Sequence, residues 1–363
     1  MSNCLIFRHT INGDFMKTKT NKPSAFLILY FISTGFYANR ILTRFIFQNA
    51  GKWAWLYIWG LSLIILGISP FIYRYMQKVI LQSKNKEANT GYLSKGMKIC
   101  LYIYLFISCF LCLSFLLNLT NIGWLFETST LWIMLTLLCI IYYVLNFRFD
   151  VLLRLSTLFI FPIIMQYLIF VFAKNKSFDL YAIIPFSIDD IRSIFTLIIA
   201  GLSMILDLGL CFFYFDECAT TIKKRYYYAV ILFHIFSLCF DSLIATGQFG
   251  VLIADLPFVY YESWRVINFG QFIVYLDTLA FFYWVTSAFC RLALSFYLIK
   301  KMTLNYSWLY LFSYIGLGIA TLYILNHGAI YTILRIYLLT FSTLALFIAL
   351  VLKVYLIRKR ESK

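Results

Sequence analysis

Charged residues are scarce in this chain, and their scarcity excludes an ordinary water-soluble domain. Only 13% of the 363 residues are Asp, Glu, Lys or Arg, whereas 63% are hydrophobic. A soluble domain needs polar residues over its outward surface, and here there are too few to cover one. Apolar runs of about twenty residues, the length of a helix that crosses a bilayer, recur between Ser24 and Ile357. The sequence therefore predicts an all-α polytopic membrane protein.

Proline and glycine are also few, and no low-complexity tract is present. Five prolines and sixteen glycines leave no room for a disordered domain or a long linker. We expect one transmembrane permease-like domain over 24–357. A cytoplasmic N-terminal tail (1–23) precedes it, and a basic cytoplasmic C-terminal tail (358–363) follows. The first tail does not read as a signal peptide, because it has no apolar core followed by a small-residue cleavage site.

Histidine is rare, and the cysteines lack a ligand pattern, which together disfavour an enzyme or a metal protein. Membrane-embedded transferases use a histidine or carboxylate cluster near a membrane face, but the three histidines, His9, His234 and His327, are scattered. No HExxH, GxSxG or phosphate-binding glycine loop occurs. We expect no catalytic residue, cofactor or metal. The nine cysteines are interpreted as small buried hydrophobic residues: Cys4, Cys100, Cys109, Cys112, Cys139, Cys211, Cys218, Cys239 and Cys290.

The hydrophobic runs predict ten membrane spans separated by charged or polar gaps. The predicted ranges are 24–45, 53–73, 99–119, 131–147, 155–173, 192–215, 226–246, 271–299, 307–325 and 332–357. The fourth range is short, and the eighth is long enough to tilt or to project from the bilayer.

The distribution of Lys and Arg predicts the orientation. With a cytoplasmic N-terminus, 22 of the 31 basic residues fall on the inner side, 8 on the outer side and one, Arg291, within a span. The positive-inside rule therefore predicts that both chain ends face the cytoplasm. The net charge of +16 is then a topological signal that also favours anionic lipid, and we expect no nucleic-acid partner.

Ten spans with both ends inside allow two five-span halves of opposite orientation. In transporters built this way, solutes bind near the midplane, where the first helix of each half is interrupted. Small and polar residues lie in the middle of the first and sixth spans: Ser33, Thr34 and Gly35 in one, and Gly201, Ser203, Asp207 and Gly209 in the other. The pattern favours two broken helices. It is also compatible with small residues that only let helices approach closely.

Ionisable residues inside the spans are costly unless they are paired or wetted, so they mark either a polar pathway or interhelical pairs. His234 and Asp241 are seven residues apart and share one face of the seventh span. Asp277 and Arg291 are about four turns apart on the eighth, so each needs a partner on another helix or a place near an interface, where we expect Asp277. Asp207 and Arg40 complete the set.

The segment 256–301 carries the most specific residues of the chain. A proline, a helix-entry phrase, an acidic residue, a tryptophan, a phenylalanine, a cation and a tyrosine follow in order: Pro257, Phe269–Phe272, Asp277, Trp284, Phe289, Arg291 and Tyr297. This order resembles the seventh-to-eighth helix region of the endospore germinant-receptor B subunits, a family of spore germination permeases. In that family a lysine usually stands where this chain has Arg291.

Two further segments add to the resemblance, which is most specific between about 148 and 301. Residues 148–186 look like the family's fifth helix and following loop: Arg154, Pro162, Asp179, Leu180 and Pro185 match. The stretch FDECATTIKKRYYY is similar to the family's basic exit from helix six, and the N-terminal third fits more loosely through Trp55.

The resemblance implies a fold of the amino acid–polyamine–organocation superfamily. This is a leucine-transporter-like inverted repeat of five plus five helices with broken helices 1 and 6. It implies a place in the inner membrane of the dormant bacterial spore, beside a larger membrane A subunit and a lipoprotein C subunit. The B subunit of that complex recognises a small nutrient, usually an amino acid, and starts germination. A transport-competent amino acid or amine permease shares the fold and is the alternative.

On this basis we expect a ligand site at the two helix breaks, with the first break at Gly35. The predicted ligand residues are Thr34, Gly35, Tyr37, Gly201, Ser203, Ser287 and Cys290. The predicted network of charged and polar residues inside the membrane is Asp207, His234, Asp241 and Arg291. The family's second glycine is replaced here by Tyr37, so we expect a bulky ring to fill part of the pocket and to alter or impair recognition.

Overall fold

The computed structural model describes residues 23–82, 91–123, 128–147, 149–172, 178–184, 191–214, 222–266, 277–303, 307–325 and 328–361. Every regular element within these ranges is a helix. Six helical stretches are long and apolar enough to cross a membrane, and one of them, Leu27–Lys78, covers two predicted spans. By length and composition the chain is thus an all-helical integral membrane protein, as predicted.

The helices follow one another without a sheet or a second domain within the described residues. In the first half they are α2 (Pro23–Phe36), the π-helix η1 (Tyr37–Leu42), α3 (Thr43–Ala50), η2 (Gly51–Trp53), α4 (Ala54–Gln82), α5 (Gly91–Gly123), α6 (Thr130–Phe147) and α7 (Phe149–Phe172). The rest are α8 (Leu180–Ile183), α9 (Ile194–Leu208), α10 (Cys211–Tyr214), α11 (Lys224–Phe249), η5 (Gly250–Ala254), α12 (Val259–Val266), α13 (Asp277–Met302), α14 (Ser307–Leu325) and α15 (Gly328–Glu361).

All ten predicted ranges contain helix, although several helices are longer than the apolar runs that predicted them. Helices α4, α5 and α15 each continue past their runs, and α15 reaches Glu361, well into the predicted tail at 358–363. A helix needs apolar side chains only inside the hydrocarbon, and Lys and Arg are good helix formers beyond it. The tail residues 1–22 and residues 271–276 of the eighth range lie outside the described residues, as do Cys4, Cys218, His9 and His327.

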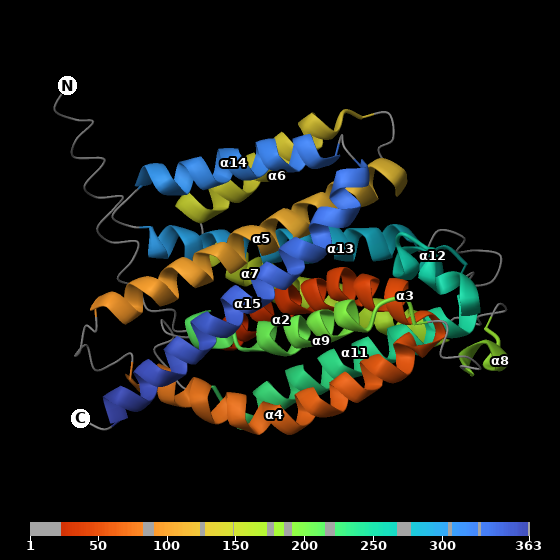
Figure 1. Ribbon diagram of the computed structural model, residues 1–363, viewed down its shortest axis with the longest axis horizontal. Coiled ribbons are helices and arrows are strands. Elements are labelled where there is room, and N and C mark those ends of the chain that lie inside the picture. The colour runs from red at the N-terminus through yellow and green to blue at the C-terminus, as the bar shows by residue number, and fades with distance from the viewer. Residues whose placement is uncertain are drawn as a thin grey trace.

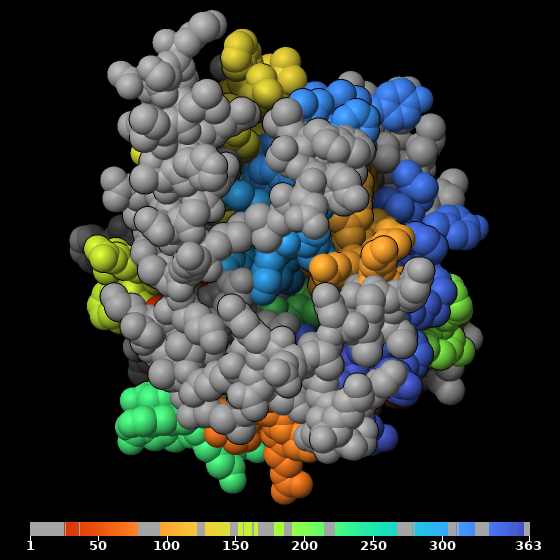
Figure 2. Space-filling view, turned by 90° about the vertical axis from the view of Figure 1, so that its left-hand side faces the viewer, coloured from red at the N-terminus to blue at the C-terminus, as the bar shows by residue number. Residues whose placement is uncertain are grey.

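The long helices lie side by side along the long axis of the molecule (Figure 1). Helix α5 packs between α13 and α15, α2 packs between α7 and α13, and α4 lies beside α11. Figure 2 looks at the end where α4 and α15 finish, and places the orange end of α4 beside the green start of α11. Segments far apart in the sequence therefore build one continuous core.

Two glycines close helices at the opposite end of the bundle. Gly51 ends α3 and Gly250 ends α11, and both have a φ of 51°, a backbone conformation that costs a glycine little. The short helices that follow, η2 and η5, pack against each other. These two turns hold the ends of α3 and α11 together, which places both helices beside the polar interior described below.

Gly201 allows α4 to pack closely on α9 and does not break the helix, so the predicted interruption at Gly201 is wrong. Helix α9 runs without a break from Ile194 to Leu208. A Cβ atom at Gly201 would lie 2.5 Å from the Tyr57 hydroxyl and 3.0 Å from Leu61 Cδ2. The Tyr57 hydroxyl donates to the Leu197 carbonyl at 2.6 Å, so the missing side chain is what lets α4 bond to α9. At this position the small residue lets two helices approach closely, which was the alternative to a helix break.

We predict that Gly201→Ala destabilises the protein by about 1–2 kcal/mol, because Tyr57 must move and its hydrogen bond to α9 is lost. Gly60→Ala on α4 is the matched control, since no atom lies within 4 Å of its Cβ position. The measurement is the melting temperature of detergent-solubilised protein. Equal melting temperatures for the two variants would contradict the packing role.

Candidate functional site

The first membrane helix changes type beside the predicted break. Gly35 lies in the last turn of α2, and the wider π-helix η1 begins two residues later, at Tyr37. All six residues of η1 are buried. The Thr43 hydroxyl donates to the Asn39 carbonyl at 2.6 Å and so satisfies one backbone group of the widened turn. The expected unwinding at Gly35 is therefore corrected to a change of helix type from Tyr37 onward, a kind of irregularity that recurs at functional sites.

The sixth predicted span is interrupted after Leu208. The chain turns at Gly209 and Leu210 before α10 begins, with the Gly209 amide donating to the Leu206 carbonyl at 2.8 Å. The Tyr30 hydroxyl of α2 bonds to the carbonyls of Leu208, at 2.7 Å, and Asp207, at 3.2 Å. The backbone groups freed at this turn are thus bonded to the helix that leads the other half of the chain.

A buried ion pair joins this interruption to α13. Arg291 Nη2 lies 2.8 Å from Asp207 Oδ1, Nη1 lies 3.2 Å from Oδ2, and the two side chains are 0% and 1% exposed. On α5, the Ser108 hydroxyl accepts from Arg291 Nε at 3.1 Å, and the Tyr104 hydroxyl accepts from Nη2 at 3.0 Å while donating to Asp207. This is the partner on another helix that the sequence required of Arg291.

The ring of Tyr37 covers this cluster. Arg291 Cζ lies 4.4 Å from the ring centroid, which places the guanidinium on the electron-rich face of the ring. Tyr37 is 0% exposed, so it fills the space between η1 and α13, in line with the bulk expected of it. Its hydroxyl lies beside that of Ser203 on α9, and among the described residues neither hydroxyl has another hydrogen-bonding neighbour.

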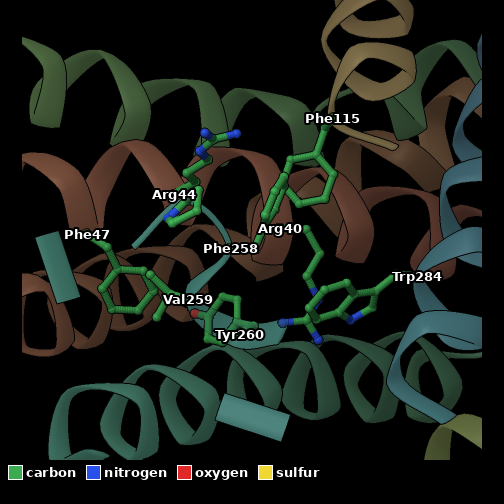
Figure 3. A pocket seen from close by; sticks show the side chains of 9 residues that line it. Arg40, Arg44, Phe47, Phe115, Phe258, Val259, Tyr260 and Trp284 are labelled. Carbon is green, nitrogen blue, oxygen red and sulfur yellow. The ribbon is translucent and has the colours of Figure 1, made fainter. Parts of the chain in front are cut away.

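A second buried ion pair lies one helical turn further along η1. Arg40 Nη1 is 3.2 Å from Asp241 Oδ2 on α11, and both side chains are 2% exposed. The guanidinium lies 4.6 Å from the ring centroid of Tyr260 and 4.8 Å from that of Trp284. Figure 3 shows it next to these two rings. The neighbouring Asn39 donates to the Ser237 hydroxyl at 2.8 Å. Three side chains of η1, those of Tyr37, Asn39 and Arg40, thus lie against polar groups of other helices.

His234 shares the polar face of α11 with Asp241, as its spacing indicated. It is buried with its ring edge-on to Phe31 at 5.7 Å, and its Nδ1 has no hydrogen-bond partner. A Cβ atom at Gly35 would lie 3.8 Å from that nitrogen, so His234 faces the end of α2. Asp277 is the first residue of α13, and its side chain lies outside the described residues.

The structure divides the predicted ligand residues into two groups. The Thr34 hydroxyl donates to the Tyr30 and Phe31 carbonyls of its own helix, Gly201 packs on Tyr57, and Cys290 is buried as a free thiol. These residues, together with Gly35, show no group directed to a ligand. The others, Tyr37, Ser203 and Ser287, have buried hydroxyls whose only polar neighbours among the described residues are further hydroxyls.

The sequence interpretation missed Tyr30, Tyr104, Ser108 and Tyr260. Tyr104 and Ser108 stand four residues apart in the apolar stretch of α5, so they share one face, and that spacing was the available signal. Tyr30 and Tyr260 carried no such signal among 28 tyrosines.

No group of three His, Cys, Asp or Glu side chains that could hold a metal ion occurs in the part of the chain that the structure describes. Of the seven described cysteines, Cys109, Cys112, Cys211 and Cys290 are buried, whereas Cys139 is exposed and Cys100 and Cys239 are intermediate. The interpretation of the cysteines as buried residues is thus confirmed for four positions and wrong for Cys139, which lies on the outward face of α6.

We predict that Arg291→Met and Asp207→Asn each destabilise the protein by about 3–5 kcal/mol, because each leaves its buried partner without a counter-charge. The double variant removes both charges and should lose less than the sum of the two. Melting temperatures in detergent measure the effect. Arg192→Met is the control, since its ion pair with Asp255 is 55% and 66% exposed and contributes little. An Arg291→Met protein as stable as Arg192→Met would overturn this assignment.

A scan against protein-family models found no match for the chain, and a search of curated proteins found none. What this molecule does must follow from its own residues and their geometry.

Proposed function

We propose that the bundle is an inverted repeat of two five-helix halves, the leucine-transporter-like architecture that the sequence resemblance implies. The first half is α2–α3, α4, α5, α6 and α7, and the second is α9–α10, α11, α13, α14 and α15. In this proposal all ten segments cross the membrane and both chain ends face the cytoplasm.

The pairing of neighbouring helices supports the repeat. If each helix is replaced by its counterpart in the other half, several contacting pairs map onto contacting pairs, although the close packing of α2 on α13 has no comparable counterpart between α9 and α5. The packing of α2 on α7 corresponds to that of α9 on α15, α5 on α15 to α13 on α7, and α6 on α13 to α14 on α5. Likewise α4 on α9 corresponds to α11 on α2. Such agreement is expected of two halves related by a two-fold axis.

Within this fold we propose that the protein is the ligand-recognition subunit of a nutrient receptor. It binds a small amino acid-like molecule beside η1, the end of α9 and α13. The observation that carries the proposal is the set of three hydroxyls on Tyr37, Ser203 and Ser287, each 0% exposed, whose nearest polar neighbours are other hydroxyls: Tyr37 and Ser203 face each other, and Ser287 faces Tyr283. Such hydroxyls keep unused donor and acceptor capacity inside the membrane, which favours a polar ligand that takes it up.

The chemistry of these groups suits a zwitterion. A hydroxyl both donates and accepts, so the same three side chains can bond to a carboxylate and to an ammonium group. The neighbouring Arg291 and Asp207 neutralise each other, so the site carries no net charge from them. A neutral site with polar groups of both kinds fits a molecule whose own charges cancel.

We further propose that ligand binding shifts an equilibrium between bundle conformations. Tyr37 fills the space beside Arg291, so an entering ligand must displace its ring or take its place. A ligand can drive such a change only through a difference in affinity between the two states. By the resemblance, the change would pass to an A subunit and a lipoprotein C subunit in the spore inner membrane and start germination.

We predict that Ser203→Ala and Ser287→Ala each weaken amino acid binding about three- to tenfold, because each removes one hydrogen bond to the ligand. The same changes should alter the melting temperature of the free protein little, since each removes at most one contact with a neighbouring hydroxyl. Ser62→Ala on α4 is the control: its hydroxyl is also buried beside one polar side chain, Cys239, but lies on another helix. Binding is measured on protein in lipid nanodiscs with labelled amino acids.

A binding loss equal to that of Ser62→Ala would contradict the proposed site. Flux separates the sensor from the permease: labelled amino acid accumulating in proteoliposomes would favour transport, whereas saturable binding without accumulation favours the sensor. A deletion strain whose spores still respond to every single amino acid would contradict the germination role.

A further inference from the structure

The end of α4 and the start of α11 are joined by one carbonyl group and a cluster of tyrosines. The Tyr73 hydroxyl and Gln77 Nε2, both on α4, donate to the Ile222 carbonyl at 2.9 and 2.8 Å. The ring of Tyr73 also lies 5.1 Å from that of Tyr227 and 6.2 Å from that of Tyr228. In Figure 2 the two helix ends lie side by side at the lower edge of the face shown. The two ends therefore form one continuous surface.

This surface is positively charged. Its five basic side chains are all exposed and form what we call the α4–α11 basic patch: Arg74 and Lys78 on α4, and Lys223, Lys224 and Arg225 at the start of α11. No acidic side chain among the described residues pairs with Arg74 or with the three cations at the start of α11. Asp216 and Glu217 lie outside the described residues, and with them the stretches 74–78 and 215–225 still hold five basic residues against two acidic ones.

Aromatic rings lie beside the cations of the patch. Lys224 Nζ is 5.7 Å from the ring centroid of Tyr228, and Arg225 Cζ is 4.9 Å from that of Tyr226. Arg225 Nη2 also donates to the Tyr226 hydroxyl at 3.2 Å. A cation beside a ring keeps its charge, and tyrosines are enriched at the level of the lipid headgroups. The combination is therefore typical of a membrane–water interface.

Apolar side chains continue from the patch along both helices. Phe71 on α4, and Leu232 and Phe236 on α11, are exposed. The ring of Phe71 lies 4.4 Å from that of Tyr75, which stands between the two α4 cations in the sequence, so the apolar surface begins directly beside the patch. A free phosphate would use only the positive charge of this surface. A phospholipid would use both the charge and the apolar side chains.

We propose that the α4–α11 basic patch binds the phosphate of an anionic phospholipid. The cations of the two helices contact the phosphate, the tyrosine rings lie at the level of the headgroup, and the acyl chains lie along the exposed apolar side chains of α4 and α11. The distribution of Lys and Arg predicts that this lipid belongs to the inner leaflet. The site is separate from the proposed amino acid site, since Tyr37, Ser203 and Ser287 lie on other helices.

The test titrates the full chain in detergent with dioctanoyl phosphatidylglycerol, dioctanoyl phosphatidylcholine and glycerol 3-phosphate, and bound molecules are counted by native mass spectrometry. We expect phosphatidylglycerol to bind about tenfold more tightly than phosphatidylcholine, whose own ammonium group competes with the cations of the protein. Glycerol 3-phosphate, which has no acyl chains, should bind about tenfold more weakly than phosphatidylglycerol. Equal affinity for the two lipids would overturn the proposal. Equal affinity for phosphatidylglycerol and glycerol 3-phosphate would also overturn it, because it would reveal a general phosphate site.

Two triple variants of equal charge locate the site. The first, Lys223→Gln, Lys224→Gln and Arg225→Gln, should weaken phosphatidylglycerol binding about tenfold or more, because each basic residue near an anionic lipid contributes about fivefold. The matched control removes three exposed cations from α5 and α15 and should weaken binding less than threefold: Lys95→Gln, Lys98→Gln and Arg358→Gln. Equal losses for the two triple variants would show an effect of net charge and would overturn the site.

A single substitution tests whether α4 contributes. Arg74→Gln should weaken phosphatidylglycerol binding about fivefold, although Arg74 lies far in the sequence from the cations of α11. Parent-like binding by this variant would contradict a site shared by the two helices. Because Arg74 is exposed and has no acidic partner among the described residues, we expect the variant to melt at the temperature of the parent protein when no lipid is added. Phosphatidylglycerol should then raise the melting temperature of the parent protein more than that of the variant.

Discussion

A charge buried among membrane helices must be neutralised by a partner on another helix, and this requirement organises the interior of the protein. Arg291 meets Asp207 across α13 and α9, and Arg40 meets Asp241 across η1 and α11. Removing water from a lone charge costs several kcal/mol, so each pair specifies which helices lie together. Apolar side chains alone would specify this poorly, because lipid solvates them as well as a neighbouring helix does.

The π-helix η1 lies against both pairs. Tyr37 stacks on the first pair and Arg40 belongs to the second, while Asn39 bonds to Ser237 between them. A widened helix displaces side chains relative to a regular one, and it persists here because its neighbours satisfy both its side chains and its backbone. The polar interior therefore depends on an irregular segment of six residues.

Much of this architecture could be predicted from the sequence. Helix positions follow from the length of the apolar runs, and the need of Arg291 for a distant partner follows from its position. The choice of Asp207 does not, because it depends on which helices pack together. From the sequence alone, a glycine that breaks an apolar helix cannot be distinguished from one that lets a neighbouring helix pack closely. Only the Tyr57 hydroxyl over Gly201, and the turn at Gly209, tell the two apart.

The hydrogen bond of Thr34 could also have been predicted from the sequence. A threonine inside a helix often bonds back to its own backbone, as Thr34 does, which leaves its hydroxyl unavailable to a ligand. The roles of Tyr30 and Tyr104 could not, since their partners lie more than a hundred residues away in the chain.

Helix α15 is longer than a bilayer requires, and it contacts the turn that ends α9. Its 34 residues span about 51 Å at 1.5 Å per residue, well beyond the ~30 Å of hydrocarbon. About two thirds of the way along, Leu350 touches the turn that ends α9: a Cβ atom on Gly209 would lie 2.8 Å from its side chain. Because α15 also packs along α5, any change at that turn would act directly on the contact between the last helix and the middle of the bundle.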